Sequence, residues 1–322
     1  MPLVSVLMTA YNREDFIADA IESVLAQTFT DWELIIVDDC SRDRTVEIAR
    51  RYAAQDGRIR VHVNERNLGD YPNRNHAATL ATGEFMKYHD SDDLMYPHCL
   101  AVMVPLLTAY PQAGFALTAG GREWSGGPCP MLLTPLLSYQ REFFGLGMFQ
   151  LGPACALFRT EVFRRLGGFP LHGAASDNVF WLNACKSENV LLVPGSLFWY
   201  RRHPGQELVS PQAERSYALA NRYVWEVLDA EDCPLQPIER EQAKRNWIWV
   251  LGKRILLDFR RGDFKRGWKF LSNAGPGFAD WLRYFRRQRR DIFAGTPRNA
   301  AGDFIVPDWS VFEQTEPRAK SR

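Results

Sequence analysis

The sequence predicts an α/β fold, a mainly parallel mixed sheet flanked by helices, with an α-helical C-terminal extension. Over about the first hundred residues, short apolar runs rich in β-branched residues alternate with segments whose apolar residues recur at helical spacing. Strands that are separated by helical crossovers lie parallel in one sheet, with helices on both faces. A basic, aromatic segment at 244–290 is expected to form the helical extension.

The predicted elements alternate regularly along the chain. We expect strands at 3–9, 32–39, 58–65 and 83–90, separated by helices at 16–25, 44–57 and 73–81. The first strand is the apolar run LVSVLMT, and Gly57 ends the second helix. The uncharged segment 99–121 contains Pro105 and Pro111, so we expect a helix, a turn and a strand there rather than a membrane span.

Length and composition suit one large domain with an extension. The chain has 322 residues, of which 46% are hydrophobic and 24% are charged, an ordinary globular composition. We place the sheet domain at residues 1–210 and the helical, basic and aromatic region at 211–322. The six cysteines have neither metal-site nor disulfide-framework spacing, and the N-terminus lacks the basic region of a signal peptide. These features favour a cytoplasmic protein.

Polar residues stand at the ends of three predicted strands. Ligands of open α/β sheets bind beyond the carboxyl ends of the strands, so we expect these residues to share a site. Three neighbouring carboxylates repel one another, and a divalent cation would remove the conflict; oxygen ligands suit Mg²⁺ or Mn²⁺, with diphosphate oxygens completing the coordination. The alternative is that DSDD is a surface turn. The strand-end residues are Thr9, Ala10, Tyr11 and Asn12, then Asp38 and Asp39, then Asp90, Asp92 and Asp93.

Two glycine-rich phosphate-binding motifs are missing from the sequence. No G-x-G-x-x-G follows the first strand, and no G-x-x-x-x-G-K-[ST] occurs anywhere. A metal ion is therefore the candidate for holding the phosphates of a nucleotide.

Several motifs resemble those of the inverting family 2 glycosyltransferases, which have the GT-A (Rossmann-like) fold and use nucleotide sugars. The resemblance covers about residues 3–205 and rests on the order and spacing of the motifs. They are VSVLMTAYNRED, SVLAQTFTDWELIIVDDCSRDRT, NERNLGDYPNRNHAATLATGEFMKYHDSDD and WYRRHPGQ.

The resemblance implies a nucleotide-sugar site at the strand ends. It implies that the first strand end and Tyr11 pack around the nucleobase and that Asp39 hydrogen-bonds the base. It also implies that Asp90 contacts the sugar, that Asp92 binds the cation and that Arg74 faces the nucleotide. The site residues expected on this basis are Thr9, Ala10, Tyr11, Asn12, Asp39, Arg74, Asp90 and Ser91.

The residue types themselves leave alternatives open. An ionised Asp39 only accepts hydrogen bonds, so it could read a ring N–H of uracil or thymine, or it could cap the helix that begins in SRDRT. Tyr11 offers a flat face for stacking, or it is a core aromatic.

Asp177 is the candidate catalytic base. It follows a small-residue loop and precedes a predicted helix, so a plain helix N-cap is the alternative role. The resemblance places the family's base in a similar acid-plus-helix segment, well downstream of D-x-D. A positioned carboxylate that accepts the proton of an acceptor hydroxyl contributes about 10²–10⁴-fold to the rate. We expect the helix N-terminus to keep Asp177 ionised.

The stretch YRRHPGQ follows an apolar strand and supplies further candidates. Arg201 is expected to pair with the diphosphate, and neutral His203 to ligate the metal beside Asp92. A basic turn after an edge strand is the alternative.

The segment 244–290 holds fourteen Lys and Arg against three Asp, a net charge of +11 in a chain whose net charge is only +1. Its interleaved aromatic residues suit an anionic membrane surface, where rings lie at the interface and cations meet phosphate. The alternative is a solvated helical bundle with Arg-rich outer faces. On the first interpretation the protein is peripheral on the cytoplasmic face of the membrane.

The sequence as a whole predicts an inverting, metal-dependent transfer of a hexose or N-acetylhexosamine from a nucleotide sugar, a UDP-sugar, to a hydroxyl of a glycan or lipid-linked glycan. The donor side is expected within about 1–100 and the acceptor side within about 100–210. No nucleic acid partner is expected. The alternatives are a non-catalytic nucleotide-sugar or glycan-binding protein on the same fold, and a D-x-D metal-dependent phosphatase.

Overall fold

The structure, a computed structural model, describes residues 1–118, 128–195, 197–203, 206, 211–273, 275–284, 294–303 and 305. Its strands are β1 (Val4–Ala10), β2 (Trp32–Asp38), β3 (Ile59–Val63), β4 (Phe85–Tyr88), β5 (Leu94–Met95), β6 (Ala113–Thr118), β7 (Met131–Leu133), β8 (Ala156–Arg159), β9 (Asn189–Val193) and β10 (Phe198–Trp199).

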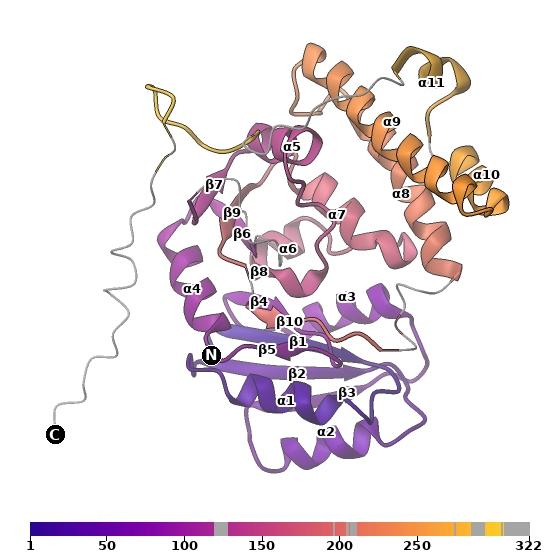
Figure 1. The fold of residues 1–322 in the computed structure, drawn as a ribbon. Helices are drawn as coiled ribbons and strands as arrows, with labels where there is room; N and C mark the ends of the chain where they lie inside the picture. The colour runs from indigo at the N-terminus through magenta and orange to yellow at the C-terminus, as the bar shows by residue number, and fades with distance from the viewer. Residues whose placement is uncertain are drawn as a thin grey trace.

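The helices surround the sheet and continue beyond it (Figure 1). They are α1 (Ile17–Leu25), α2 (Thr45–Ala53), α3 (Asp70–Leu80), α4 (Cys99–Ala109), α5 (Pro135–Phe144), α6 (Thr160–Arg165), α7 (Ser176–Ala184), α8 (Pro211–Asp229), α9 (Pro237–Arg260), α10 (Phe264–Asn273) and α11 (Phe278–Tyr284), with 3₁₀ turns η1 (Pro153–Cys155) and η2 (Gly173–Ala175).

Within the described residues, eight strands form one mixed sheet in the order β3-β2-β1-β4-β8-β6-β9-β7. The first four lie parallel, β8 runs antiparallel to β4 and β6, and β9 is parallel to β6. A small antiparallel sheet pairs β10 with β5. This pairing carries residues 200–203 to the loop between β4 and β5, where the acidic cluster lies.

The predicted elements of the first hundred residues are present, with small differences at their ends. Helix α3 begins at Asp70, three residues before the predicted start. Gly69 precedes it with a φ of 91°, a conformation that glycine adopts without strain. The segment after Cys99 forms α4 and β6, the predicted helix and strand.

The strands bury both faces, so alternate residues of β1 enter different halves of the core. Val6 and Met8 pack with α1 and α4 on one face. Leu7 belongs to the cluster on the other face, which includes residues of α5 and α7. This two-faced burial explains why the parallel strands are continuously apolar in sequence.

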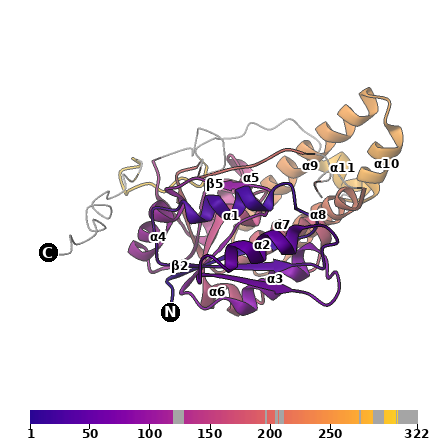
Figure 2. The same cartoon turned by 90° about the horizontal axis from the view of Figure 1, so that it is seen from below.

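The C-terminal helices share the core of the sheet domain. Val224 of α8, Trp247 and Leu251 of α9 and Phe270 of α10 belong to the same hydrophobic cluster as the strand residue Leu7. Helices α8 to α11 extend from the side of α7, away from α4 (Figures 1 and 2). The expected boundary at residue 210 falls just before α8 and stays a prediction.

None of the described helices has the length and apolarity needed to cross a bilayer. All six cysteines are free in the structure.

Candidate active site

A cavity of about 600 Å³ lies at the carboxyl ends of β1, β2 and β4; we call it the strand-end cavity. Ten of the twelve residues predicted for the site line it, while Arg201 and His203 are not among the lining residues. Parallel strands place these side chains together because their carboxyl ends meet at one sheet edge. The ten are Thr9, Ala10, Tyr11, Asn12, Asp39, Arg74, Asp90, Ser91, Asp92 and Asp177.

The loops after β1 and β2 are joined by polar contacts, which fixes the first wall of the cavity. The Asn12 N–H donates to Ser41 Oγ at 2.8 Å, and Asn12 Oδ1 accepts from the Arg42 N–H at 2.9 Å. Asn12 has a φ of 53°, which asparagine tolerates better than most residues. Tyr11 is 41% exposed, so the alternative of a core aromatic is wrong, and its ring is free to meet a ligand.

Asp39 holds the loop that leads into α3. One carboxylate oxygen accepts from Asn64 Nδ2 and from the Leu68 N–H, and the other accepts from the Gly69 N–H, all at 2.8 Å. The N-cap of α2 is Arg44, and the Thr45 N–H of its first turn donates to Asp43 rather than to Asp39. The alternative role of Asp39 as a cap of that helix is therefore wrong.

Arg74 joins two acidic side chains on the cavity wall. Its Nε donates to Asp70 Oδ1 at 2.8 Å, and its Nη2 lies 2.7 Å from Asp90 Oδ1. Burial acts to raise the pKa of Asp90, but the Arg74 guanidinium outweighs it, so this pKa lies below its ordinary value. Asp90 is therefore ionised at neutral pH.

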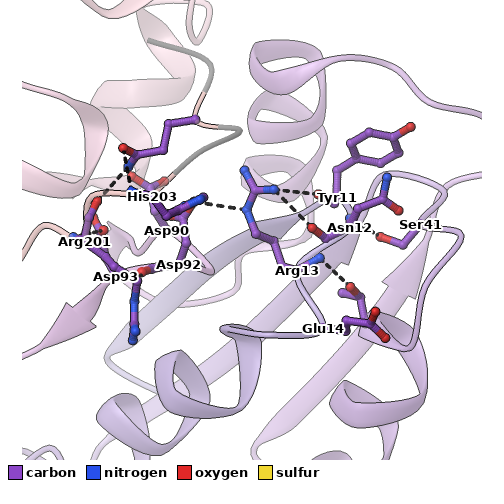
Figure 3. A network of polar contacts seen from close by, with 12 residues as sticks. Tyr11, Asn12, Arg13, Glu14, Ser41, Asp90, Asp92, Asp93, Arg201 and His203 are labelled. Carbon is purple, nitrogen blue, oxygen red and sulfur yellow. Dashed lines mark hydrogen bonds and ion pairs between the residues drawn. The ribbon is translucent and has the colours of Figure 1, made fainter. Parts of the chain in front are cut away.

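Asp92 is paired from two sides (Figure 3). Its Oδ2 accepts from Arg13 Nε at 3.0 Å and lies 3.0 Å from His203 Nε2. Arg13 also donates from Nη1 to the carbonyl oxygens of Tyr11 and Asn12 at 3.1 Å. Arg13 thus links the first strand end to the acidic cluster, a role that the sequence analysis missed although the residue follows Tyr11 and Asn12 directly.

Arg201 anchors the acidic loop from outside the cavity. Its N–H donates to Asp93 Oδ1 at 2.9 Å, its Nε donates to the Asp92 carbonyl at 2.9 Å, and its Nη2 contacts Asp19 at 2.9 Å. In this structure the guanidinium is therefore occupied by protein groups. The contact of Arg201 with the diphosphate stays a prediction.

The three acids of the cluster are only partly satisfied, because Asp93 Oδ2 is buried without a hydrogen-bond partner. Burial and the neighbouring charges of Asp90 and Asp92 raise the pKa of Asp93 to about 8. Arg74, Arg13, His203 and the Arg201 N–H meet part of the charge, but the expected repulsion remains at Asp93. That a divalent cation relieves it stays a prediction. Among the described residues, no group of three or more His, Cys, Asp or Glu side chains is placed to hold a metal ion.

Asp177 lies in the first turn of α7 and is 7% exposed. The N-cap is Ala175, so the alternative of a plain N-cap is wrong. Burial raises the pKa of Asp177 to about 7, although the Asn178 N–H at 2.7 Å and the Tyr71 hydroxyl both favour the charged form. The expectation that the helix N-terminus keeps Asp177 ionised is corrected, because burial outweighs the helix terminus and raises the pKa of Asp177 to about 7.

Several lining residues were not predicted as site residues. Tyr71 and Asn73 come from α3, Pro153 from η1 and Tyr217 from α8. Tyr200, directly before Arg201, also lines the cavity and lies within the stretch that the sequence analysis singled out.

The fold and the cavity define an open α/β protein with a polar ligand site at the carboxyl ends of its strands. The chain belongs to the family described as glycosyl transferase family 2, whose model matches residues 5–167. The family resemblance drawn from the sequence is confirmed.

Two curated relatives illustrate the similarity. The putative teichuronic acid biosynthesis glycosyltransferase TuaG of Bacillus subtilis is 47% identical over 92 residues, 29% of this chain and 36% of the relative. The UDP-Glc:alpha-D-GlcNAc-diphosphoundecaprenol beta-1,3-glucosyltransferase WfgD of Escherichia coli is 37% identical over 105 residues, 33% of this chain and 41% of the relative. The chain spans less than half the length of these relatives.

Two solved structures share the fold. A TarS fragment from S. aureus in complex with UDP-GlcNAc has a TM-score of 0.58 at 21% identity, covering 94% of this chain and 99% of the fragment. The mannosyltransferase PcManGT from Pyrobaculum calidifontis in complex with GDP-Man and Mn²⁺ has a TM-score of 0.60 at 18% identity, covering 87% of each chain. The predicted fold class is confirmed.

Proposed function

We propose that this protein is an inverting glycosyltransferase that moves a sugar from a nucleoside diphosphate sugar, a UDP-sugar, to a hydroxyl of a glycan or lipid-linked glycan. The observation that carries the proposal is the position of Asp177, a buried carboxyl with a pKa of about 7, in the same cavity as the acids of the D-x-D stretch. WfgD is named for a UDP-Glc donor, and the TarS fragment is in complex with UDP-GlcNAc; both support a UDP-sugar as the donor.

The donor lies along the strand ends in this proposal. Tyr11 stacks on the base, and Asp39, fixed by three hydrogen bonds, reads a ring N–H from a preorganised position. Arg74 keeps Asp90 ionised, so that Asp90 accepts from sugar hydroxyls. Thr9, Ala10, Asn12 and Ser91 complete the walls.

Asp92 and His203 fit a divalent cation, Mn²⁺ or Mg²⁺. Their oxygen and imidazole donors lie within 3.0 Å of each other and suit Mn²⁺ in particular. Diphosphate oxygens and water would supply the other ligands, as is usual where a protein offers few. When bound, the ion would neutralise the charge that develops on the departing nucleoside diphosphate. The complex of PcManGT with Mn²⁺ supports this assignment.

Asp177 is the general base in this proposal. Its carboxylate takes the proton of the acceptor hydroxyl while the acceptor oxygen bonds to the anomeric carbon and the bond from that carbon to the diphosphate breaks. Attack from the opposite face inverts the anomeric centre without a covalent enzyme intermediate. A pKa near 7 is favourable, because a base works best when its pKa lies close to the operating pH.

The C-terminal helices support attachment to an anionic membrane surface. Leu256 and Leu257 on α9 and Phe264 and Trp268 on α10 are exposed, among the cations of segment 244–290. Exposed apolar and aromatic side chains beside Lys and Arg suit the interface of an anionic bilayer. This surface would bring the enzyme to lipid-linked acceptors.

A panel of nucleotide sugars, each with Mn²⁺, tests the function. We expect one donor to raise the melting temperature, because a ligand that binds only the folded state stabilises it. Turnover of that donor with lipid-linked acceptors, lost in Asp177→Asn while donor binding remains, supports the enzyme. Donor binding without turnover in either protein would favour the non-catalytic binding protein. Family membership leaves no support for the D-x-D phosphatase.

A further inference from the structure

A second cavity, of about 860 Å³, lies between the sheet domain and the C-terminal helices; we call it the helical cleft. Its walls come from α5 and α7 on one side and from α8, α9 and α10 on the other. Figure 1 shows these helices gathered on the side of the molecule that carries α7. The acceptor side is expected from the sequence within about 100–210, and segment 244–290 is expected to form a membrane surface or a solvated bundle.

The helical cleft adjoins the strand-end cavity at the proposed base. Tyr217 lines both spaces. Asp177 lines the strand-end cavity, and the next residue, Asn178, lines the cleft. Asn178 Nδ2 donates to the Phe149 carbonyl at 2.6 Å, which fixes the segment that separates the two spaces. The two spaces therefore lie next to each other at Tyr217 and at the Asp177–Asn178 step of α7.

The cleft combines an apolar floor with a cationic rim. Phe149, Leu182, Val224 and Trp247 supply apolar surface. The cationic lining residues are Arg254, Lys265, Arg266 and Lys269.

Only two acids among the described lining residues oppose these four cations. Glu142 already accepts from the N–H groups of Met148 and Phe149, at 2.7 and 2.9 Å. Asp263 accepts from the Arg266 N–H at 3.1 Å, at the start of α10, and Arg266 Nε lies 4.0 Å from Asp258 Oδ2, outside the lining. Among the described lining residues, the four cations therefore outnumber the two acids.

We propose that the helical cleft binds the acceptor, and that the acceptor is an isoprenoid diphosphate-linked glycan whose diphosphate is held by the cationic rim. The inference rests on the proposed function and names its substrate class. A diphosphate matches several converging Lys and Arg side chains, and an isoprenoid chain matches the aromatic and aliphatic floor. The glycan then reaches past Tyr217 to place its hydroxyl at Asp177.

Farnesyl diphosphate is the probe, measured by calorimetry on the full chain saturated with UDP and Mn²⁺. We expect binding that weakens about tenfold in Lys265→Glu and in Lys269→Glu, because hydrogen bonds to charged groups are lost. Lys253→Glu is the matched control, since Lys253 is exposed on α9 but does not line the cleft. Farnesol, which lacks the diphosphate, should bind far more weakly.

The outcomes separate the competing explanations. If UDP abolishes farnesyl diphosphate binding, the probe occupies the strand-end cavity and the inference is wrong. An equal loss in Lys253→Glu would indicate unspecific attraction to the positive charge of segment 244–290 and overturns the inference. UDP binding without farnesyl diphosphate binding overturns only this inference, whereas a failure to bind any nucleotide sugar overturns the proposed function.

Discussion

The carboxylate of Asp92 and the imidazole of His203 lie 3.0 Å apart, although 111 positions separate them in the sequence. The β5–β10 pairing makes this contact, because it brings the chain after Trp199 back to the acidic loop. Figure 3 shows both side chains beside Arg201 and Asp93. The contact leads to the first prediction.

Asp92→Asn should weaken Mn²⁺ binding in the presence of UDP by at least about 10–100-fold, since even indirect partners of a metal ligand contribute that much. His203→Ala should act in the same direction. Titration of Mn²⁺ against the melting temperature of the UDP-saturated protein measures the effect. The matched control is Asp15→Asn, an exposed acid that does not line the cavity. Unchanged Mn²⁺ affinity in both test variants would remove the proposed metal site.

The pH dependence of turnover should report Asp177. Because burial raises its pKa to about 7, the carboxylate that accepts the proton forms only as the pH rises through about 7. We expect kcat/KM to fall tenfold per pH unit below that value and to level off above it. A profile that stays flat between pH 5 and 8 would rule out Asp177 as the base.

Asp177→Asn should also raise the free energy of unfolding at pH 8. Substituting a residue that only packs or hydrogen-bonds in the fold would lower it. A carboxyl whose folded-state pKa is raised is stabilising only while protonated, so its contribution is lost as pH rises from about 4 to about 7. The asparagine amide has nearly the shape of the protonated carboxyl and carries no charge at any of these pH values. Unfolding in urea at pH 8 should therefore show a variant that is more stable by up to about 4 kcal/mol, since burial raises the pKa of Asp177 by about three. Turnover by the variant should be lower by about 10²–10⁴-fold.

Arg74→Gln should destabilise the fold by about 3–5 kcal/mol at pH 8, because it leaves Asp70 and Asp90 without their cation. Arg74 holds the pKa of Asp90 below its ordinary value, so the stability it gives is present at neutral pH and is lost as acid protonates Asp90. The difference from the parent protein should therefore shrink only as the pH falls below about 4 in urea unfolding. Arg74→Lys keeps the charge and should recover part of the stability; equal losses in both variants would contradict the ion-pair explanation.

Much of the site could be predicted from the sequence because parallel topology fixes where strand ends meet. Apolar runs ending in Tyr11, Asp39 and Asp90 were enough to place these residues at one edge. No contact between side chains was needed for that prediction.

The partners of the acids could not be predicted, because they depend on how distant segments pack. Arg13 lies two positions after Tyr11 in the sequence, but the orientation of its side chain toward Asp92 depends on the loop conformation at Asn12, whose φ is 53°. The turn of Arg201 toward Asp19 follows from the β5–β10 pairing. Tyr217 enters the cavity from α8, whose docking depends on the tertiary core rather than on a motif.

The exposed aromatic residues of α10 give the last prediction, which concerns the membrane. Phe264 and Trp268 are 60% and 63% exposed, and both rings lie against Phe259 of α9 at centroid distances of 5.8 and 6.1 Å. The full chain should float with vesicles that contain phosphatidylglycerol, more strongly at low salt, and poorly with neutral phosphatidylcholine vesicles.

The double variant Phe264→Ser, Trp268→Ser should lower the floated fraction without unfolding the protein, because most of both side chains is already in water. Leu171→Ser is the matched control, since Leu171 is 69% exposed but lies outside the C-terminal helices. If the double variant floats as well as the parent protein, the α10 aromatics do not enter the interface. If neutral vesicles bind equally well, the cations of segment 244–290 are not what attracts the membrane, and the solvated helical bundle becomes the better interpretation of their charge.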